Sequence, residues 1–418
     1  MLSRSMSGFP KAPGFDHTVP FLREGYAFVS RRCDRLQSDG FHARLMLRPV
    51  VCLRGPAAAE LVYSGERVTR VGAMPVSAVK LLQDFRSVQM LDDERHRARK
   101  AMFVRVCSVH EARRLADTMA GEWRSYFAGR TQPVVLLDAA NAILTRTTLC
   151  WLGIDPDAAD APSRCREMSA MVDSVAVIGP RQWRAQYLRH RAERWAESVI
   201  RQRRGAHGAS DETPIDVIAS QRGDGRDLLD PAVAAVELLN IVRPTVAASR
   251  FIVFTAMALH EHPIWRERFA SGDDSHLEAF VTEVRRLAPF FPVIGGRARF
   301  AFDWRGHRFA AGDWMLLDLY GTDRDERSWP AAEVFRPERF ADRRPSLYEF
   351  VPQGAGVTEE THRCPGASIV TEIMMTAARL LTRGMTYELP KQDLSVDLSR
   401  MPARPQSGFI MNNVRMIG

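Results

Sequence analysis

The sequence predicts a mainly helical protein with a small β-rich portion. Apolar residues recur at helical spacing through most of residues 81–287, which is typical of amphipathic helices. The pattern changes to alternation over residues 299–304 and 314–319, which indicates short strands, and a strand signal also occurs at residues 50–53. With 418 residues, 45% of them hydrophobic, the chain is long enough to bury a large core.

The longest predicted helix covers residues 230–259. Asp230 is a good N-cap, and Pro231 suits the first helical position because the N–H that proline lacks would be unpaired there anyway. At about 1.5 Å per residue the helix would be roughly 43 Å long, enough to cross a whole domain. A second helix is expected at residues 275–287 and ends before Pro289.

A last helix is expected at residues 367–381. The polar, glycine-rich stretch at residues 204–228 is either a domain boundary or a surface loop between two helices. We expect a single domain, residues 1–418, with β-rich parts near residues 45–65 and 293–320.

Charge and apolar runs exclude several classes of protein. The net charge is +8, but the basic residues lack the aromatic interleaving of a nucleic-acid binder, so no nucleic-acid partner is expected. The longest apolar run, residues 251–259, is too short for a membrane span. The N-terminal residues lack the apolar core of a signal peptide, so we expect a cytoplasmic protein. A basic concentration at residues 181–204 is either a solvated helix face or a docking patch.

Two side chains break helix rules side by side in the middle of the longest predicted helix. Pro244 removes a backbone donor and leaves the carbonyl of Asn240 without its helical partner, which predicts a kink. Arg243 places a permanent charge in an apolar run, and a buried guanidinium needs a partner. Three interpretations are open: Arg243 pairs with a buried acid such as Glu237, reaches the surface, or binds the carboxylate or phosphate of a ligand.

Cys364 stands in a setting that favours chemistry. It follows the Pro- and Gly-containing stretch at residues 350–356 and precedes a predicted helix, so the helix dipole and the neighbouring Arg363 favour its thiolate form. A thiolate in this place is a nucleophile or a metal ligand. The other cysteines show no Cys-x-x-Cys spacing, so we expect them to be small buried hydrophobes and expect no zinc site.

Two further motifs precede Cys364 in the sequence. A Glu-x-x-Arg helix carries Glu283 and Arg286, and a Phe-Arg-Pro-Glu-Arg-Phe stretch containing Arg339 follows it. In this order, ahead of Phe-x-x-x-Gly and Cys-Pro-Gly, they resemble the cytochrome P450 superfamily over essentially the whole chain. The resemblance implies the mainly α cytochrome P450 fold and haem b, whose iron is ligated by Cys364 in a haem-thiolate loop at residues 350–366. It also implies that Glu283, Arg286 and Arg339 form a buried structural triad.

Two departures from the general pattern are similar to the bacterial fatty-acid peroxygenase branch. Arg243-Pro244 stands where most members carry an acid–alcohol pair for proton delivery, and the loop before Cys364 is longer. The resemblance implies a hydrogen-peroxide-dependent oxidoreductase that hydroxylates long-chain fatty acids at the α or β carbon without a redox partner protein. The thiolate would favour O–O cleavage, and the substrate carboxylate held by Arg243 would act as general acid and base.

The same resemblance assigns the substrate site. Arg243 would bind the substrate together with Gln89 and Val175, and Pro244 would shape the helix kink. Gln89 would lie over the haem near the oxidised carbons. Because relatives with histidine at this position tend towards decarboxylation, Gln89 favours hydroxylation. Val175 stands where relatives often carry a bulkier pocket residue.

The resemblance also assigns haem contacts and leaves alternatives. Arg70, His96 and Lys100 match positions at the haem propionates, for which the alternative is solvated surface charge, and Arg363 is a further haem contact. Three other functions stay open: a fatty-acid decarboxylase that produces terminal alkenes, a conventional monooxygenase that depends on a redox partner, and a non-catalytic haem- or fatty-acid-binding protein.

Overall fold

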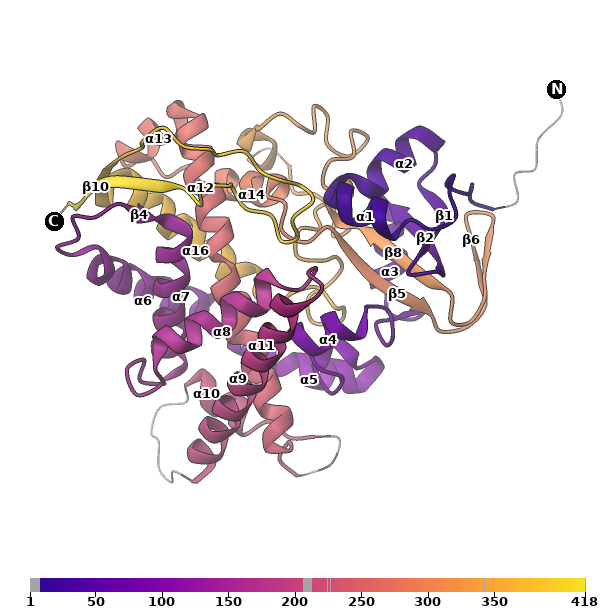
Figure 1. Cartoon of the computed structure of the whole chain (residues 1–418), viewed down its shortest axis with the longest axis horizontal. Coiled ribbons are helices and arrows are strands. Elements are labelled where there is room, and N and C mark those ends of the chain that lie inside the picture. Colours follow the sequence, from indigo (N-terminus) through magenta and orange to yellow (C-terminus); the bar gives the residue numbers. More distant parts are fainter. Residues whose placement is uncertain (1–7, 206–212, 224, 226, 342, 418) are drawn as a thin grey trace.

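The computed structural model has a large helical body at one end and a β-rich portion at the other (Figure 1). It describes the chain except residues 1–7, 206–212, 224, 226, 342 and 418. The indigo N-terminal elements and the orange strands of the C-terminal half meet in the β-rich portion, while the magenta helices build most of the helical body. The predicted fold class, mainly α with a small β-rich portion, is confirmed.

The main sheet has five strands in the order β1-β2-β8-β5-β3. Its strands are β1 (Gly40–Leu45), β2 (Arg48–Arg54), β8 (Trp314–Asp318), β5 (Val293–Ala298) and β3 (Val68–Thr69). β2 and β8 run parallel, and the other neighbours are antiparallel. The predicted β-rich part near residues 45–65 therefore starts earlier than expected, and helix α3 (Pro56–Tyr63) occupies its second half.

The sheet is buried on both faces, which explains the uninterrupted apolar run at residues 50–53. Val51 and Leu53 pack into one hydrophobic cluster, whereas Val50 and Cys52 pack into another. Successive side chains of a strand point to opposite faces, so a strand covered on both sides needs apolar residues at every position.

Short strands complete the β structure. They are β4 (Val134–Val135), β10 (Ile410–Met416) and β9 (Met385–Glu388), which form one small sheet, and β6 (Phe302–Trp304) and β7 (His307–Phe309), which form a hairpin. The alternation at residues 299–304 predicted a longer strand than the hairpin contains. The backbone N–H of Arg299 instead donates to the carbonyl of Arg67 at 2.8 Å, so the first part of this stretch lies outside the β6–β7 ladder.

The remaining helices are joined by turns and loops. Their bounds are α1 (Thr18–Glu24), α2 (Phe28–Leu36), α4 (Val76–Leu82), α5 (Asp93–Val106), α6 (Val109–Phe127), α7 (Leu136–Leu152), α8 (Ala161–Asp173), α9 (Pro180–Gly205), α10 (Pro214–Ala219), α11 (Pro231–Ala247), α12 (Ser249–Glu261), α13 (Pro263–Ala270), α14 (Leu277–Leu287), α15 (Leu319–Thr322) and α16 (Ala367–Arg379). Single 3-10 turns occur at Gly25–Ala27, Val88–Met90 and Pro337–Phe340, and a π-helical turn at Leu380–Gly384 follows α16. Helix α10 lies inside the glycine-rich stretch 204–228, part of which is outside the described residues.

The longest predicted helix is two helices in the structure. The Asp230 carboxylate caps α11 by accepting from the N–H groups of Ala232 and Val233, as expected. Pro244 lies within α11, and the break comes four residues later at Ala248, whose N–H donates to the carbonyl oxygens of Pro244 and Thr245. The helix expected at residues 230–259 is therefore present as α11 and α12, which a single irregular turn at Ala248 divides one turn after Pro244.

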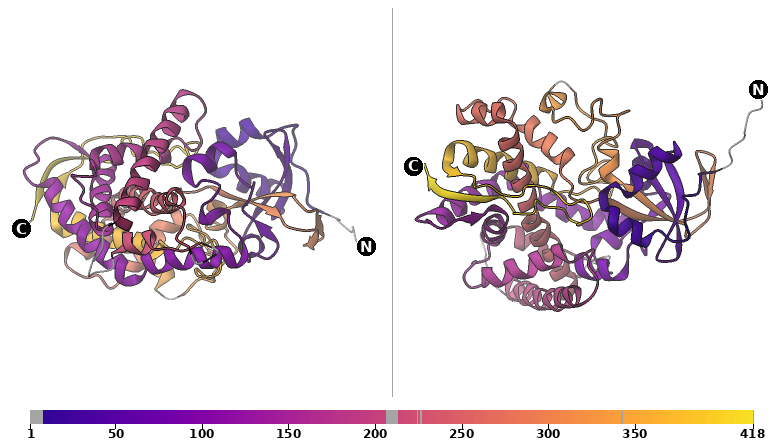
Figure 2. Two further views of the ribbon diagram at one scale, coloured as in Figure 1. Left: turned by 90° about the horizontal axis from the view of Figure 1, so that it is seen from below. Right: turned by 45° about the horizontal axis from the view of Figure 1, so that its top comes forward.

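Helix α11 is the centre of the helical body. It packs against α7, α8 and α9, and α12 continues from it towards α14 and α16. In both views of Figure 2 the C-terminal yellow strand lies at the opposite end of the molecule from the indigo β-rich portion. Because of the packing of α11 and α12, residues of α11 lie close to several helices that are distant in the sequence.

One apolar segment of the described residues passes the length and hydropathy test for a membrane span. It is Pro231–Glu261, the α11–α12 pair, and 94% of its most apolar window is buried inside the protein. Core helices of globular proteins pass the same test, because they are apolar on every side.

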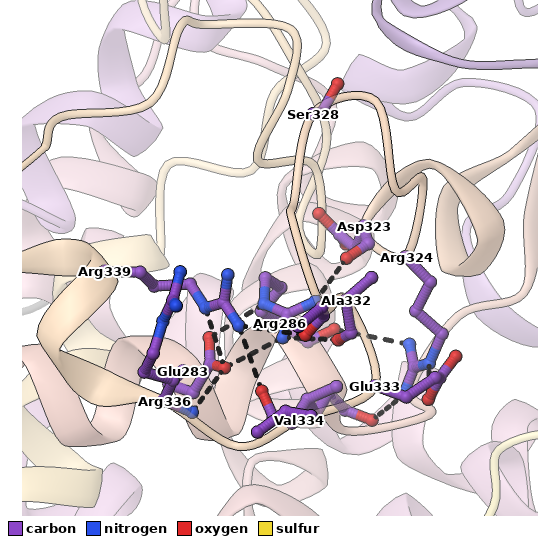
Figure 3. A network of polar contacts seen from close by, with 12 residues as sticks. Glu283, Arg286, Asp323, Arg324, Ser328, Ala332, Glu333, Val334, Arg336 and Arg339 are labelled. Carbon is purple, nitrogen blue, oxygen red and sulfur yellow. Dashed lines mark hydrogen bonds and ion pairs between the residues drawn. The ribbon is translucent and has the colours of Figure 1, made fainter.

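A buried ion network joins α14 to the loop that follows α15 (Figure 3). Glu283 is fully buried and accepts from Arg286 at 2.7 and 2.8 Å and from Arg339 Nε at 3.1 Å. The two guanidinium groups also donate to backbone carbonyls of the loop, among them those of Asp323 and Ala332 for Arg286. The predicted triad thus holds the loop against α14 through charge-assisted hydrogen bonds.

Removing the charge of Glu283 should unfold the protein more easily. In Glu283→Gln, two buried guanidinium groups lose their counter-ion, so the free energy of unfolding should fall by about 3–5 kcal/mol. Urea unfolding followed by circular dichroism measures it. The control Glu278→Gln changes an exposed residue of the same helix and should cost less than about 0.5 kcal/mol. Equal stability of the two variants would contradict a structural role for the triad.

Candidate active site

A cavity of about 320 Å³ lies between α11, the 3-10 turn Val88–Met90 and the loop that precedes α16. Its wall contains Cys364, Arg243, Pro244, Gln89 and Val175, all of which were predicted site residues. Most of the remaining wall is apolar and comes from α5, α12, β5 and the loop before β5. Residues far apart in the sequence therefore share one enclosure that is suited to an apolar ligand with a polar end.

The loop that carries Cys364 is held from several sides. The Cys364 N–H donates to the carbonyl of Gln353 at 2.9 Å, and the side chain of Gln353 accepts from Arg285 of α14. Arg285 also donates to Thr371 of α16 at 2.9 Å. Gly354 has a φ of +94° and lies so close to Tyr63 that a Cβ would meet the phenol oxygen at 2.8 Å. The thiol is thus presented at a rigid turn at the beginning of α16.

A cluster of basic groups lies at the same side of the cavity as this loop. Lys100 donates to the carbonyls of Thr361 and Arg363, and the rings of His96 and His362 are 4.1 Å apart. Burial and the neighbouring cations lower the pKa of His96 to about 4 and that of Lys100 to about 8. Lys100, His96 and Arg70 are all buried, so the alternative of solvated surface charge is wrong for the three of them.

Arg70 completes this basic cluster and has a free hydrogen-bonding group. Its Nη1 donates to the carbonyl of Gly295 at 2.6 Å, but its buried Nη2 has no partner among the described residues. Arg363 also lines the cavity, with Nη1 donating to the carbonyl of Gly356 at 3.1 Å. Three cationic side chains, those of Arg70, Lys100 and Arg363, have no acid in their hydrogen bonds in the described part of the chain, so they favour anionic ligand groups.

These residues fit a haem. The thiolate of Cys364 would hold the iron and the apolar wall would accommodate the macrocycle. Arg70, Lys100 and Arg363 would offer cationic partners to its propionate groups, and the neutral His96 a hydrogen bond. The unpartnered nitrogen of Arg70 is the observation that requires such a group, because a buried guanidinium donor without an acceptor is costly.

The other part of the cavity wall contains Arg243. Its side chain is 7% exposed, Nη2 donates to Oδ1 of Asn240 at 3.2 Å, and Nη1 has no partner in the described part of the chain. Burial and the nearby Arg189 lower the pKa of Arg243 to about 9, so the side chain still carries its charge at neutral pH. The guanidinium therefore presents an unneutralised charge and a free donor to the cavity.

Two of the three interpretations of Arg243 are wrong. Glu237 does not pair with it, because the Glu237 carboxylate accepts from Arg99 of α5 at 2.8 Å instead. Arg243 does not reach the surface either, since it is buried. A ligand anion is the remaining interpretation, and the free Nη1 fits it.

Sequence reasoning missed two residues that position this site. Arg285 supports the Cys364 loop, but it looked like an ordinary helix residue beside the Glu283-x-x-Arg286 motif. Asn240 contacts both Arg243 and Gln89. A signal was present for Asn240: Glu237, Asn240 and Arg243 recur at intervals of three, so they lie on one face of a buried helix.

Replacing the thiol should change the spectrum of the bound haem. In Cys364→Ser the strong thiolate donor is lost, so the ferrous–carbonyl complex should lose the long-wavelength Soret band that thiolate ligation produces. Absorption spectroscopy of the reduced, carbonyl-saturated protein measures this. Cys150→Ser, a partly exposed thiol of α7 outside the cavity wall, should keep the band. A surviving band in Cys364→Ser means that another residue is the ligand.

Known proteins share both the fold and these sequence motifs. The family model described as "Cytochrome P450" matches residues 275–396. Cytochrome P450SP alpha (CYP152B1), solved in complex with (R)-ibuprofen, is 41% identical, with 97% of this chain and 100% of that chain covered and a TM-score of 0.93. Cytochrome P450EX alpha (CYP152N1) with myristic acid is 36% identical, with 98% and 99% covered and a TM-score of 0.93.

A variant of cytochrome P450 OleT in complex with arachidonic acid is also similar, at 29% identity and a TM-score of 0.93 over 98% of this chain and 99% of that chain. Curated relatives match over shorter stretches. Dimethylnonatriene synthase of Arabidopsis thaliana is 30% identical over 144 residues, which is 33% of this chain and 27% of that protein. Cytochrome P450 137 of Mycobacterium tuberculosis is 26% identical over 174 residues, so the chain spans about a third (36%) of its length.

Identity at this level over entire solved chains establishes the family, and haem b is the cofactor of that family. The structure supplies the thiol and the cationic cluster that haem b needs. The chain is therefore a haem b oxidoreductase that belongs to the cytochrome P450 family and, within it, to the CYP152 branch.

Proposed function

We propose that this protein is a peroxygenase that uses hydrogen peroxide to hydroxylate long-chain fatty acids at the α or β carbon. The observation that carries the proposal is the buried Arg243, whose free Nη1 lines the same cavity as Cys364. The fatty acids present in the solved structures of P450EX alpha and OleT support this substrate class.

Arg243 is proposed to bind the fatty-acid carboxylate. A carboxylate would neutralise the buried guanidinium and provide an acceptor for its free nitrogen, which makes this position favourable for an anion. The alkyl chain would then occupy the apolar part of the cavity, where Val175 and Phe290 form part of the wall. Because the head group is tethered, only the carbons next to it can approach the reacting centre.

The proposed chemistry needs a proton to move within the cavity. When bound, the haem with its thiolate ligand supplies the iron that activates the peroxide. One peroxide oxygen goes to the substrate carbon and the other leaves as water, so a group must hold and return a proton near the peroxide. We propose that the carboxylate held by Arg243 does this, since Pro244 occupies the position next to it and offers no side-chain acid or hydroxyl.

Hydrogen peroxide carries both the oxygen and the oxidising equivalents, so we propose that no redox partner protein is required. A conventional monooxygenase remains the alternative, and the Arg243-Pro244 pair speaks against it. A decarboxylase that forms terminal alkenes is the second alternative, and Gln89 in the cavity wall favours hydroxylation over it. We propose that the protein acts in the cytoplasm, where its six free cysteines would remain reduced.

The first test uses the purified haem-loaded protein with hydrogen peroxide and a saturated long-chain fatty acid, without reductase or nicotinamide. We expect 2- or 3-hydroxy acids, identified by mass spectrometry, because Arg243 would hold only the first carbons near the iron. Terminal alkenes as the main product would favour the decarboxylase. Activity that appears only with a redox partner would contradict the peroxygenase proposal.

A second test removes the carboxylate partner. In Arg243→Ala, peroxide-driven turnover of long-chain acids should fall on the order of 100-fold, because a desolvated charge-assisted contact contributes about 2–5 kcal/mol. The haem spectrum should stay nearly unchanged, since Cys364 is untouched. Arg194→Ala on the exposed face of α9 is the matched control and should keep full turnover. Unchanged turnover in Arg243→Ala would rule out the carboxylate contact.

A further inference from the structure

A fully buried carboxylate connects the elements that carry Arg243 and Gln89. Glu237 lies on α11, and its Oε1 accepts from Arg99 of α5 at 2.8 Å and from the backbone N–H of Val88 at 2.9 Å. Val88 begins the 3-10 turn that contains Gln89. A single carboxylate therefore ties α11, α5 and this turn together, and its charge is balanced by Arg99.

Asn240 extends this contact to the substrate side of the cavity. Its Nδ2 donates to Oε2 of Glu237 at 3.0 Å and to Oε1 of Gln89 at 3.3 Å, and its Oδ1 accepts from Arg243 Nη2 at 3.2 Å. A carboxylate can only accept hydrogen bonds, so Glu237 requires the NH₂ end of the amide to face it. The oxygen of Asn240 is then directed at Arg243, which can only donate.

The two terminal nitrogens of the Arg243 guanidinium differ in their hydrogen bonding. Nη2 is occupied by Asn240, whereas Nη1 is buried without a partner among the described residues. Arg99 and Glu237 cancel each other's charge, so the charge of Arg243 is left for a ligand. Asn240 thus orients the guanidinium without neutralising its charge. A carboxylate at this position would neutralise that charge.

We propose that Asn240, oriented by Glu237, is a positioning residue that fixes Arg243 and Gln89 relative to each other and so determines which carbon of the fatty acid is hydroxylated. This inference rests on the proposed function. Neighbouring carbons of the chain are only about 1.5 Å apart. A small shift or rotation of the guanidinium would therefore present the next carbon to the reacting centre.

Asn240→Leu tests the proposal. It removes all three hydrogen bonds of the amide at similar volume, so Arg243 and Gln89 are no longer held relative to each other. We expect the ratio of 2-hydroxy to 3-hydroxy product to change by about 5-fold or more and KM to rise by about 10-fold, since hydrogen bonds to charged groups contribute about 1.5–3 kcal/mol. Mass spectrometry gives the ratio, and peroxide-driven kinetics give KM.

The matched control is Asn141→Leu. Asn141 of α7 accepts a hydrogen bond from Ser249 at 2.7 Å, and it is not part of the cavity wall. The control loses an amide hydrogen bond in the core outside the site, so it reports the effect of local destabilisation and should keep the product ratio. A ratio that changes equally in both variants would overturn the proposal, because the effect would then be general destabilisation.

Asn240→Asp is a second variant that hardly changes the size of the side chain. A carboxylate here would neutralise Arg243 and compete with the substrate, so fatty-acid affinity, followed by titration of the Soret band, should fall by about 10-fold or more. Affinity and product ratio within twofold of wild type in both Asn240 variants would overturn the positioning role. The proposed function would survive that result if wild-type protein and peroxide still form hydroxy acids and Arg243→Ala does not.

Discussion

An unneutralised guanidinium in an apolar cavity is the constraint on which the rest of this site depends. Arg243 is 7% exposed and has one terminal nitrogen without a partner in the described chain. Burying such a charge is costly, and the cost persists until an anion enters. The fold holds this group in place through α11, whose neighbours α7, α8 and α9 cover it on several sides. An anion that enters the cavity would relieve this cost, and the proposed fatty-acid carboxylate would do so.

The other side of the cavity follows the same principle. Arg70, His96 and Lys100 are buried with backbone carbonyls and rings as their contacts, rather than acids. The two carboxylates of a bound haem would offer acceptors to these groups, and the thiol of Cys364 lies in the same wall. The buried network around Glu283 holds the chain that leads to the Cys364 loop against α14.

The sequence predicted the fold class and many elements because their signals are local. The Asp230 cap, the buried strand at residues 50–53 and the helix that starts after Cys364 follow from capping chemistry and side-chain period. The strand expected at residues 299–304 was too long, since the backbone N–H of Arg299 pairs with the distant carbonyl of Arg67 and only residues 302–304 pair with β7. The helix expected at residues 230–259 is present as α11 and α12, with one irregular turn at Ala248. The strand error arises where a backbone contact with a distant segment overrides periodicity.

By itself the sequence identified the residues that we propose carry the chemistry: an arginine and a proline in the middle of an apolar helix, and a cysteine ahead of another. Their character follows from side-chain type and from neighbours within one turn, so it is visible without a fold. Only the tertiary structure decided which partners these residues have. Glu237, a neighbour of Arg243 along the helix, pairs with Arg99 of α5 and leaves Arg243 free for a ligand. A side chain can pair only with groups that the packing of the fold brings within hydrogen-bond distance. Which groups these are depends on contacts between segments that are distant in the sequence.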